Sequence, residues 1–306
     1  MPTTSGRWRA TRLRPPSRTT RDSEGASNLD LELVHSRGLP QSHGRKTYPN
    51  HSRRGPVSLN DVEHLERAPI AEAILDWRVE PAEGITVETF AEAESRLADE
   101  LPRKRIGTRV EGVFEVREGE LLPSDPVEAV QYGFLFGSAD GKRAAQFRVD
   151  GFSAHQLRPY HCWDDLFSAA LNWWSLYAEL ALPKRVVRLA ARYINRFTLP
   201  SYTEDLEEWL VAPPPIPRDL PQVLSQFLTR VTIHEAETGN AAHVTQTMEH
   251  NPDEESAVLI LDIEAFRAVS VPGDSDRIAE TLASLRVFKN QIFFGSVTPR
   301  ALELFR

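Results

Sequence analysis

The sequence predicts an α+β protein in which a curved, open antiparallel sheet carries long helices packed on one face. Three features of the chain predict this fold class. Residues 184–199 read as one long strand in which apolar and charged positions alternate. Asp140-Gly141 lies between two β-prone runs, a pattern typical of a tight hairpin. Residues 163–181 and 275–296 carry apolar side chains at helical spacing.

The long segment 184–199 is expected to bury one face and to present charge on the other, because successive side chains of a strand point to opposite faces. The face expected in the core carries Val187, Leu189, Ala191, Tyr193, Asn195 and Phe197. The opposite face carries Val186, Arg188, Ala190, Arg192, Ile194 and Arg196. The second face therefore presents three arginines at four-residue spacing.

The composition is that of an ordinary globular protein, with 41% apolar and 26% charged residues among 306. No run of about 18 apolar residues occurs, so neither a membrane-spanning helix nor a membrane partner is expected. The single cysteine, Cys162, excludes an intramolecular disulfide and a zinc finger. We therefore expect a cytoplasmic protein.

The net charge of −8 is divided unevenly along the chain. Residues 1–60 hold 11 Lys and Arg against 4 Asp and Glu, which leaves 25 basic and 40 acidic residues in the remainder. We expect residues 1–58 to form a disordered basic arm, or not to be made at all if translation starts near Val57. The acidic remainder repels phosphate backbones, so nucleic acid is not an expected partner of the core.

The first half of the ordered region, 59–182, is expected to run strand, helix, three strands and long helix. The expected elements are a strand at 68–79, a helix at 86–100, a strand at 107–118, a hairpin at 132–149 and a helix at 163–181. Pairing about the hairpin turn sets Phe136 opposite Ala145 and Phe134 opposite Phe147. The hairpin is expected to end at Asp150-Gly151.

The second half, 183–306, repeats this order of elements. The expected elements are the long strand, a short helix at 202–212 with a capping box at its start, strands at 223–236, 241–250 and 256–267, and a helix at 275–296. The sequence thus predicts two β-α-β-β-β-α halves, joined by the strand 184–199 within one continuous domain. The order of elements repeats, whereas the residues do not, so an internal pseudo-repeat is a prediction about architecture only.

Several short segments carry a resemblance to a known family. They are Ala68-Pro-Ile-Ala-Glu-Ala73, Arg148-Val-Asp-Gly-Phe152, Pro159-Tyr160 with Trp163, Arg192-Tyr-Ile-Asn-Arg196, and Leu285-Arg-Val-Phe-Lys-Asn290 followed by Phe293. With these segments the chain resembles a sporadically distributed bacterial family of conserved hypothetical proteins, over about residues 61–300. The resemblance implies a bacterial, cytoplasmic protein. It implies no substrate, cofactor or catalytic residue.

The candidate ligand site is a cluster of carboxylates and arginines where the two halves meet. Glu72 and Asp76 share one face of the first strand at the same four-residue spacing as Arg188 and Arg192. If the two strands are neighbours, these groups can form directional ion pairs across the sheet. The alternative is a surface charge ladder worth about 0–1 kcal/mol per pair.

Asp262 and Asn195 are also candidates for this cluster. Asp262 interrupts an apolar strand and needs a partner, for which Arg188 and Lys289 are candidates. Asn195 lies on the opposite face by alternation, so it joins the cluster only if a bulge re-aims it. Lys289 and Asn290 are either exposed helix residues or groups that cap the same joint.

Other patterns for chemistry are weaker. His234 and His243 fall opposite each other if a turn is centred on Thr238-Gly239, but without a third ligand the expectation is that no metal binds. Cys162 is interpreted as a structural thiol. No phosphate-binding loop, dinucleotide fingerprint or hydrolase motif occurs, and no cofactor is expected.

The function expected from these observations is binding without catalysis. The bound species would be a partner protein or a small anionic ligand, held by the Glu/Asp–Arg cluster between the halves. One alternative is an enzyme that uses the same cluster. The other is a nucleic-acid-binding accessory factor of a mobile or defence locus.

Overall fold

The computed structural model describes residues 65–111, 114–117, 120–123, 128–199, 205–250 and 256–306, and the side chains among them except those of 108–130 and His250. All of these residues belong to one compact unit, Arg54–Arg306. The arm expected at 1–58 and the capping box expected at Ser201 lie outside the described residues. No helix in the described ranges is long and apolar enough to span a membrane.

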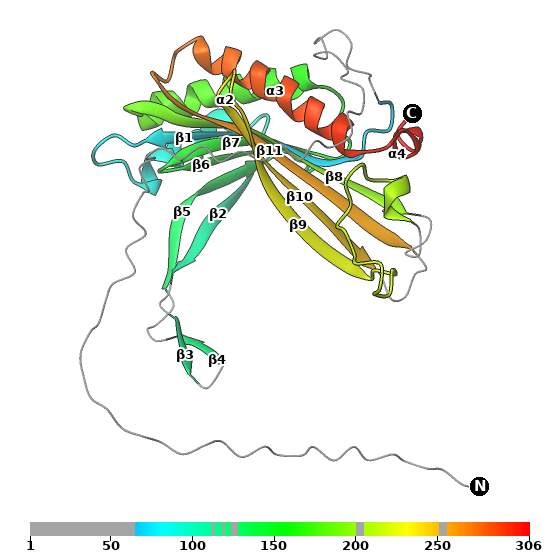
Figure 1. Ribbon diagram of the computed structural model, residues 1–306. Coiled ribbons are helices and arrows are strands. Elements are labelled where there is room, and N and C mark those ends of the chain that lie inside the picture. The colour runs from blue at the N-terminus through cyan, green and yellow to red at the C-terminus, as the bar shows by residue number, and fades with distance from the viewer. Residues whose placement is uncertain (1–64, 112–113, 118–119, 124–127, 200–204, 251–255) are drawn as a thin grey trace, which may run out of the picture. The chain divides into compact units, whose positions relative to one another are not determined.

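Nine of the described strands form one open antiparallel sheet (Figure 1). Their order is β2-β5-β6-β7-β1-β8-β11-β10-β9. The bounds are β1 (Ile70–Glu80), β2 (Arg103–Glu111), β5 (Glu128–Gly137), β6 (Arg143–Arg148), β7 (Gly151–Leu157), β8 (Arg185–Leu199), β9 (Gln226–Glu235), β10 (Asn240–His250) and β11 (Ala257–Val271). A separate hairpin pairs β3 (Phe114–Arg117) with β4 (Glu120–Pro123). The strands of the first half lie on one side of the β1–β8 pair, and those of the second half lie on the other.

Two long helices cover one face of the sheet (Figure 1). α2 (Trp163–Ala181) packs on β6 and β7, and α3 (Arg277–Ser296) packs on β8, β10 and β11. The shorter elements are η2 (Val87–Glu92), α1 (Ala93–Leu97), η3 (Leu206–Glu208) and α4 (Pro299–Glu303). The predicted open antiparallel sheet with its long helices on one face is therefore confirmed, whereas the internal repeat stays a prediction.

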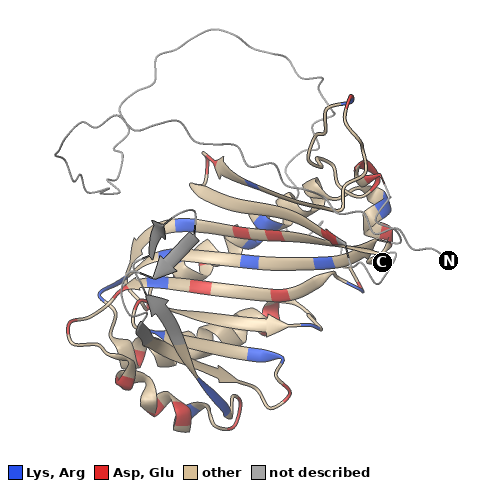
Figure 2. Cartoon of the chain, turned by 90° about the horizontal axis from the view of Figure 1, so that it is seen from below, with Lys and Arg blue, Asp and Glu red and all other residues tan. Residues whose placement is uncertain are grey.

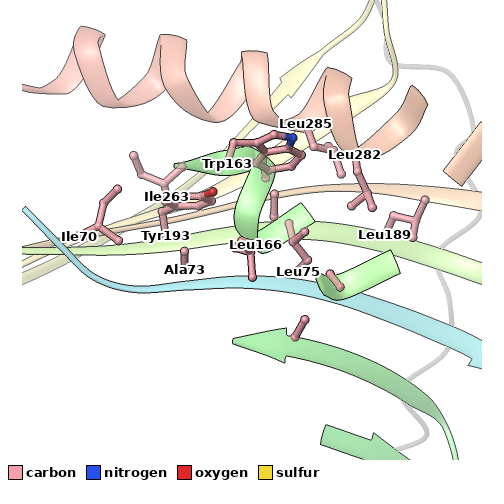
Figure 3. Close-up of a cluster of buried hydrophobic side chains, with 14 of the residues drawn as sticks. Ile70, Ala73, Leu75, Trp163, Leu166, Leu189, Tyr193, Ile263, Leu282 and Leu285 are labelled. Carbon is pink, nitrogen blue, oxygen red and sulfur yellow. The ribbon is translucent and has the colours of Figure 1, made fainter. Parts of the chain in front are cut away.

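The core between the sheet and the helices is rich in aromatic side chains. Trp77 of β1 stacks on Trp174 of α2, with ring centroids 5.6 Å apart, and meets Phe152 of β7 edge to face. Tyr177 stacks on Phe90 and donates its hydroxyl hydrogen bond to a backbone carbonyl of β6. Figure 3 shows how the aliphatic part of the core continues from β1 and β8 to α3. Burial of these large side chains is the main source of stability.

The structure confirms the element types predicted around the hairpin and the helices. Phe134 lies opposite Phe147 and Phe136 lies opposite Ala145, as the turn at Asp140-Gly141 requires. Other expected elements were wrong. The strand expected at 107–118 is divided between β2 and β3, β4 was not predicted, and the helix expected at 86–100 consists of η2 and the five-residue α1. β7 was also missed, because the chain does not leave the sheet at Asp150. It turns back there and forms β7, which pairs with both β6 and β1. The predicted helix at 202–212 is replaced, among its described residues, by the three-residue η3.

Two bulges in the β1–β8 pairing, one near each end, change which side chains face the helices. β8 holds an extra residue beside Arg188, so Val186 is buried and Val187 is only half-buried, the reverse of the predicted alternation. In β1 the extra residue Ala71 turns Ile70 onto the helix-covered face, where it pairs with Asn195. Alternation holds between these two bulges.

Replacing Gly151 by alanine is expected to destabilise the protein by more than ~2 kcal/mol. A Cβ at this position would lie 2.2 Å from the carbonyl oxygen of Trp77, which is a backbone atom of the neighbouring strand. Urea unfolding measures the change. The matched control is Gly295→Ala in α3, where an added Cβ meets nothing within 4 Å. This variant should stabilise the protein by at most ~1 kcal/mol, because alanine favours a helix more than glycine does. Equal stability of both variants would contradict the strand packing described here.

Candidate functional site

Five of the six residues predicted for the ligand site lie together on the face of the sheet that the helices leave uncovered. They are Glu72 and Asp76 of β1, Arg188 and Arg192 of β8, and Asp262 of β11. Figure 2 shows acidic and basic residues distributed along neighbouring strands of the sheet. We call this set of charged residues the polar face. The neighbouring positions of β1, β8 and β11 in the sheet bring the residues within reach of one another.

The most buried pair of the polar face joins Asp76 to Arg148, a residue of β6 that the sequence analysis did not assign to the site. Arg148 donates a 2.6 Å hydrogen bond to Asp76, and its side chain is only 8% exposed. It also donates to Gln146 and Ser153. Arg188 approaches the other oxygen of Asp76 at 3.7 Å. Asp76 therefore lies between arginines from both halves of the sheet.

The arginines of β8 find their main partners on β11. Arg192 forms a two-point ion pair with Asp262, at 2.9 and 2.6 Å, and this raises the pKa of the guanidinium. Arg188 donates to Glu264 and lies over the ring of Phe266, 4.5 Å from its centroid. The predicted partners of Asp262 were Arg188 and Lys289, and both are wrong. The partner is Arg192, which lies four residues after Arg188 on the same face of β8.

Glu72 pairs with a histidine rather than with an arginine. Its carboxylate lies 2.8 Å from Nδ1 of His155 on β7, and the other ring nitrogen of His155 lies 2.9 Å from the hydroxyl of Ser153. The hydrogen bond from His155, aided by the charges of His155 and Arg192, holds the pKa of Glu72 below its usual value despite partial burial. The carboxylates of the polar face are thus matched by cations within the protein.

Asn195, the sixth predicted residue, lies on the opposite face of the sheet. It is 3% exposed and donates hydrogen bonds to the backbone carbonyls of Tyr193 and Leu261. No bulge re-aims it toward the arginines, so it does not join the polar face. It lines a cavity under the helices instead.

This cavity has a volume of about 260 Å³ and lies between β8, α3, the start of β1 and the segment that precedes α2. We call it the Lys289 cavity. Its polar wall comprises Tyr160, Tyr193, Asn195, Arg286, Lys289 and Asn290. Ile70, Trp163 and Phe293 form part of its apolar wall, and Figure 3 shows the first two beside Tyr193 beneath α3.

Lys289 is the most unusual residue of the cavity. It is 8% exposed, and its ammonium group lies 3.5 Å from the centroid of the Tyr193 ring. Burial, together with the charge of Arg286, lowers the pKa of Lys289 to about 7. Within the described part of the chain, no hydrogen bond or ion pair joins it to another side chain, and no carboxylate lines the cavity. A buried amine without a counter-ion destabilises a fold, so it indicates a functional site.

Arg286 supplies the second cation. It lies one helical turn from Lys289 on α3, and its guanidinium lies 5.3 Å from the centroid of the Trp163 ring. The Tyr160 and Tyr193 hydroxyls are 3.0 Å apart. Burial raises the pKa of Tyr160 to about 12 and that of Tyr193 well above its usual value. Both phenols therefore keep their protons at neutral pH and can donate hydrogen bonds.

One signal for this cavity is present in the sequence. Ile278, Leu282, Leu285 and Ile292 form an apolar stripe on α3, and Lys289 occupies a position of that stripe, where a charged residue is unexpected. Tyr193 was expected on the buried face, but its hydroxyl partner Tyr160 could be found only from the folded chain. The cavity as a whole was not predicted.

The weaker candidates do not assemble into sites. The β9–β10 turn is centred one residue earlier than expected, so His243 pairs with Thr232 and His234 pairs with Ala241. Among the described residues, no group of three or more His, Cys, Asp or Glu is arranged to hold a metal ion. Cys162 is a half-buried thiol at the start of α2 and lines the Lys289 cavity.

The sequence matches no protein-family model and no curated protein. The functional argument therefore rests on the geometry of the polar face and the Lys289 cavity.

Arg148 and Arg192 are expected to differ in their contribution to stability. Arg148→Ala leaves the buried Asp76 without its main partner and should cost about 3–5 kcal/mol. Arg192→Ala should cost about 1 kcal/mol or less, because the Arg192 side chain is 43% exposed and water can solvate Asp262. Urea unfolding of both variants measures the difference. Equal losses would show that Arg148 is not the central ion pair.

Lys289→Met is expected to stabilise the protein by at least ~1 kcal/mol at pH 7.5. The pKa of Lys289 is about 7 in the folded protein and its ordinary value is 10.5, so between these pH values the unfolded chain binds a proton that the folded chain does not. The free energy of unfolding of the native protein should therefore increase as pH rises from 7 to 10. The difference in unfolding free energy between the native protein and Lys289→Met should decrease over the same range. Lys142→Met, at an exposed turn, is the control and should show no such trend.

Proposed function

We propose that this protein binds a small anionic molecule in the Lys289 cavity. The observation that carries the proposal is a pair of cations, Arg286 and Lys289, on the wall of a cavity that has no carboxylate among its described residues. An anion would supply the missing counter-charge and would raise the pKa of Lys289 toward its usual value. Hydrogen-bond donors from Tyr160 and Asn290 are available to fix its orientation.

The size of the cavity limits the ligand class. Pockets for drug-sized ligands have volumes of about 300–1,000 Å³. At about 260 Å³ the Lys289 cavity suits a metabolite-sized anion, not a nucleotide or a peptide. The apolar part of the wall, with Trp163 and Phe293, favours an organic anion over a fully hydrated inorganic one.

The polar face is a weaker candidate for the same ligand. Arg192 is already paired at two points with Asp262, and Arg188 is paired with Glu264. An anion binding there would have to displace a carboxylate, whereas an anion in the Lys289 cavity displaces none of the described side chains. The pairing also disfavours binding of a phosphate backbone to this face.

For the polar face we propose docking of a partner protein. Its ion pairs extend over neighbouring strands that no described helix covers, and the Arg192 side chain is partly exposed. Prearranged charges of both signs give specificity to a protein interface more than they give affinity.

The anion-binding proposal predicts a small-molecule adduct and a charge-dependent affinity. Native mass spectrometry of the purified full chain tests for a co-purified species beside the denatured mass. Calorimetric titration with lactate, citrate and inorganic phosphate then measures affinity. Arg286→Gln should weaken binding at least tenfold, since it removes charge-assisted hydrogen bonds worth about 1.5–3 kcal/mol.

The matched control is Arg277→Gln, which removes the same charge from an exposed position of the same helix. It should leave the affinity unchanged. If neither a co-purified species nor titratable binding is found, or if both variants weaken binding equally, the proposal is wrong.

A further inference from the structure

We propose, on the basis of the anion-binding function above, that the ligand is a small oxo carboxylate whose carbonyl carbon forms an imine with Nζ of Lys289. The carboxylate would pair with Arg286. This covalent site would lie in the Lys289 cavity and would not involve the ion pairs of the polar face.

The first support is the placement of the two basic groups. Arg286 and Lys289 are three residues apart on α3, so their side chains share one face of the helix, and both line the cavity. A guanidinium binds a carboxylate through two parallel hydrogen bonds, which an amine cannot do. A ligand whose carboxylate lies on Arg286 therefore directs its neighbouring carbonyl group toward the adjacent amine.

The second support is the state of the amine. Only a neutral amine attacks a carbonyl carbon, and an ordinary surface lysine is almost fully protonated at neutral pH. Burial and the neighbouring arginine lower the pKa of Lys289 to about 7, so near neutrality a large fraction of it is neutral. Its ammonium group lies over the Tyr193 ring, and no described residue accepts a hydrogen bond from it or pairs with it as a counter-ion.

The third support is the supply of hydrogen-bond donors. During condensation the nitrogen lone pair forms the new C–N bond, and the carbonyl π electrons move to oxygen. The oxygen then leaves as water, taking the two protons that nitrogen loses on going from amine to imine. The Tyr160 and Tyr193 hydroxyls keep their protons at neutral pH and share one hydrogen bond, so one of the two protons is free to donate a hydrogen bond to that oxygen as negative charge develops. No oxidant or reductant is needed.

Reductive trapping tests the inference on the full chain. Pyruvate is added with sodium cyanoborohydride near pH 7, and the modified lysines are identified by intact mass and peptide mapping. One adduct per chain is expected on Lys289, formed at least tenfold faster than on exposed lysines such as Lys142 and Lys184. Lactate, which has the same length and charge without a carbonyl group, should bind in calorimetry and give no adduct.

Variants separate the roles of the two cations. Lys289→Arg keeps a positive charge but should give no adduct at position 289. Arg286→Gln should lower the yield at least tenfold, and Arg277→Gln should leave it unchanged. If pyruvate and lactate both bind but Lys289 stays unmodified, the imine is wrong and anion binding stands. If neither binds, both proposals fail for this ligand class. If modification is spread evenly over surface lysines, the imine proposal is also wrong.

Discussion

The antiparallel pairing of β1 with β8 is the constraint on which both candidate sites depend. It joins the two halves of the sheet, and between the two bulges the alternation of β8 assigns neighbouring residues to opposite faces. Arg192 faces the polar network, whereas Tyr193 faces the helices and the Lys289 cavity. A shift of the β1–β8 register by one residue would exchange these faces and destroy both sites. The aromatic stacking of Trp77 on Trp174 opposes such a shift.

The two sites differ in how their charges are balanced. On the polar face each carboxylate has a basic side chain within ion-pair distance, and only Asp76 Oδ1 and Arg148 Nε are buried there without a hydrogen-bond partner among the described residues. In the Lys289 cavity the cations have no counter-charge among the described residues, although burial makes that arrangement unfavourable. Proteins retain unfavourable buried charges mainly where function requires them. This difference, rather than the number of charged residues, directs the functional argument to the cavity.

The sequence predicted the fold class, the β5–β6 hairpin and the two long helices, because alternation and helical periodicity are local properties. It placed Arg188, Arg192, Asp76 and Glu72 on one face correctly for the same reason. It missed β7, and with it the contacts of Arg148 and His155, because a turn at Asp150 was interpreted as the end of the hairpin. The bulge at Ala71 and the cavity that Ile70 helps to line depend on pairing between distant segments, which no local pattern reports.

The central claim is that Lys289 is a buried amine without a counter-ion. Nuclear magnetic resonance of lysine Cε–Hε groups, with Lys289→Arg used to assign the signal, measures its titration directly. A midpoint near pH 7 in the ligand-free protein, moving upward when an anion binds, is the result this account predicts. A midpoint near the ordinary lysine value of about 10.4 would mean that the group is solvated or paired, and would contradict the account.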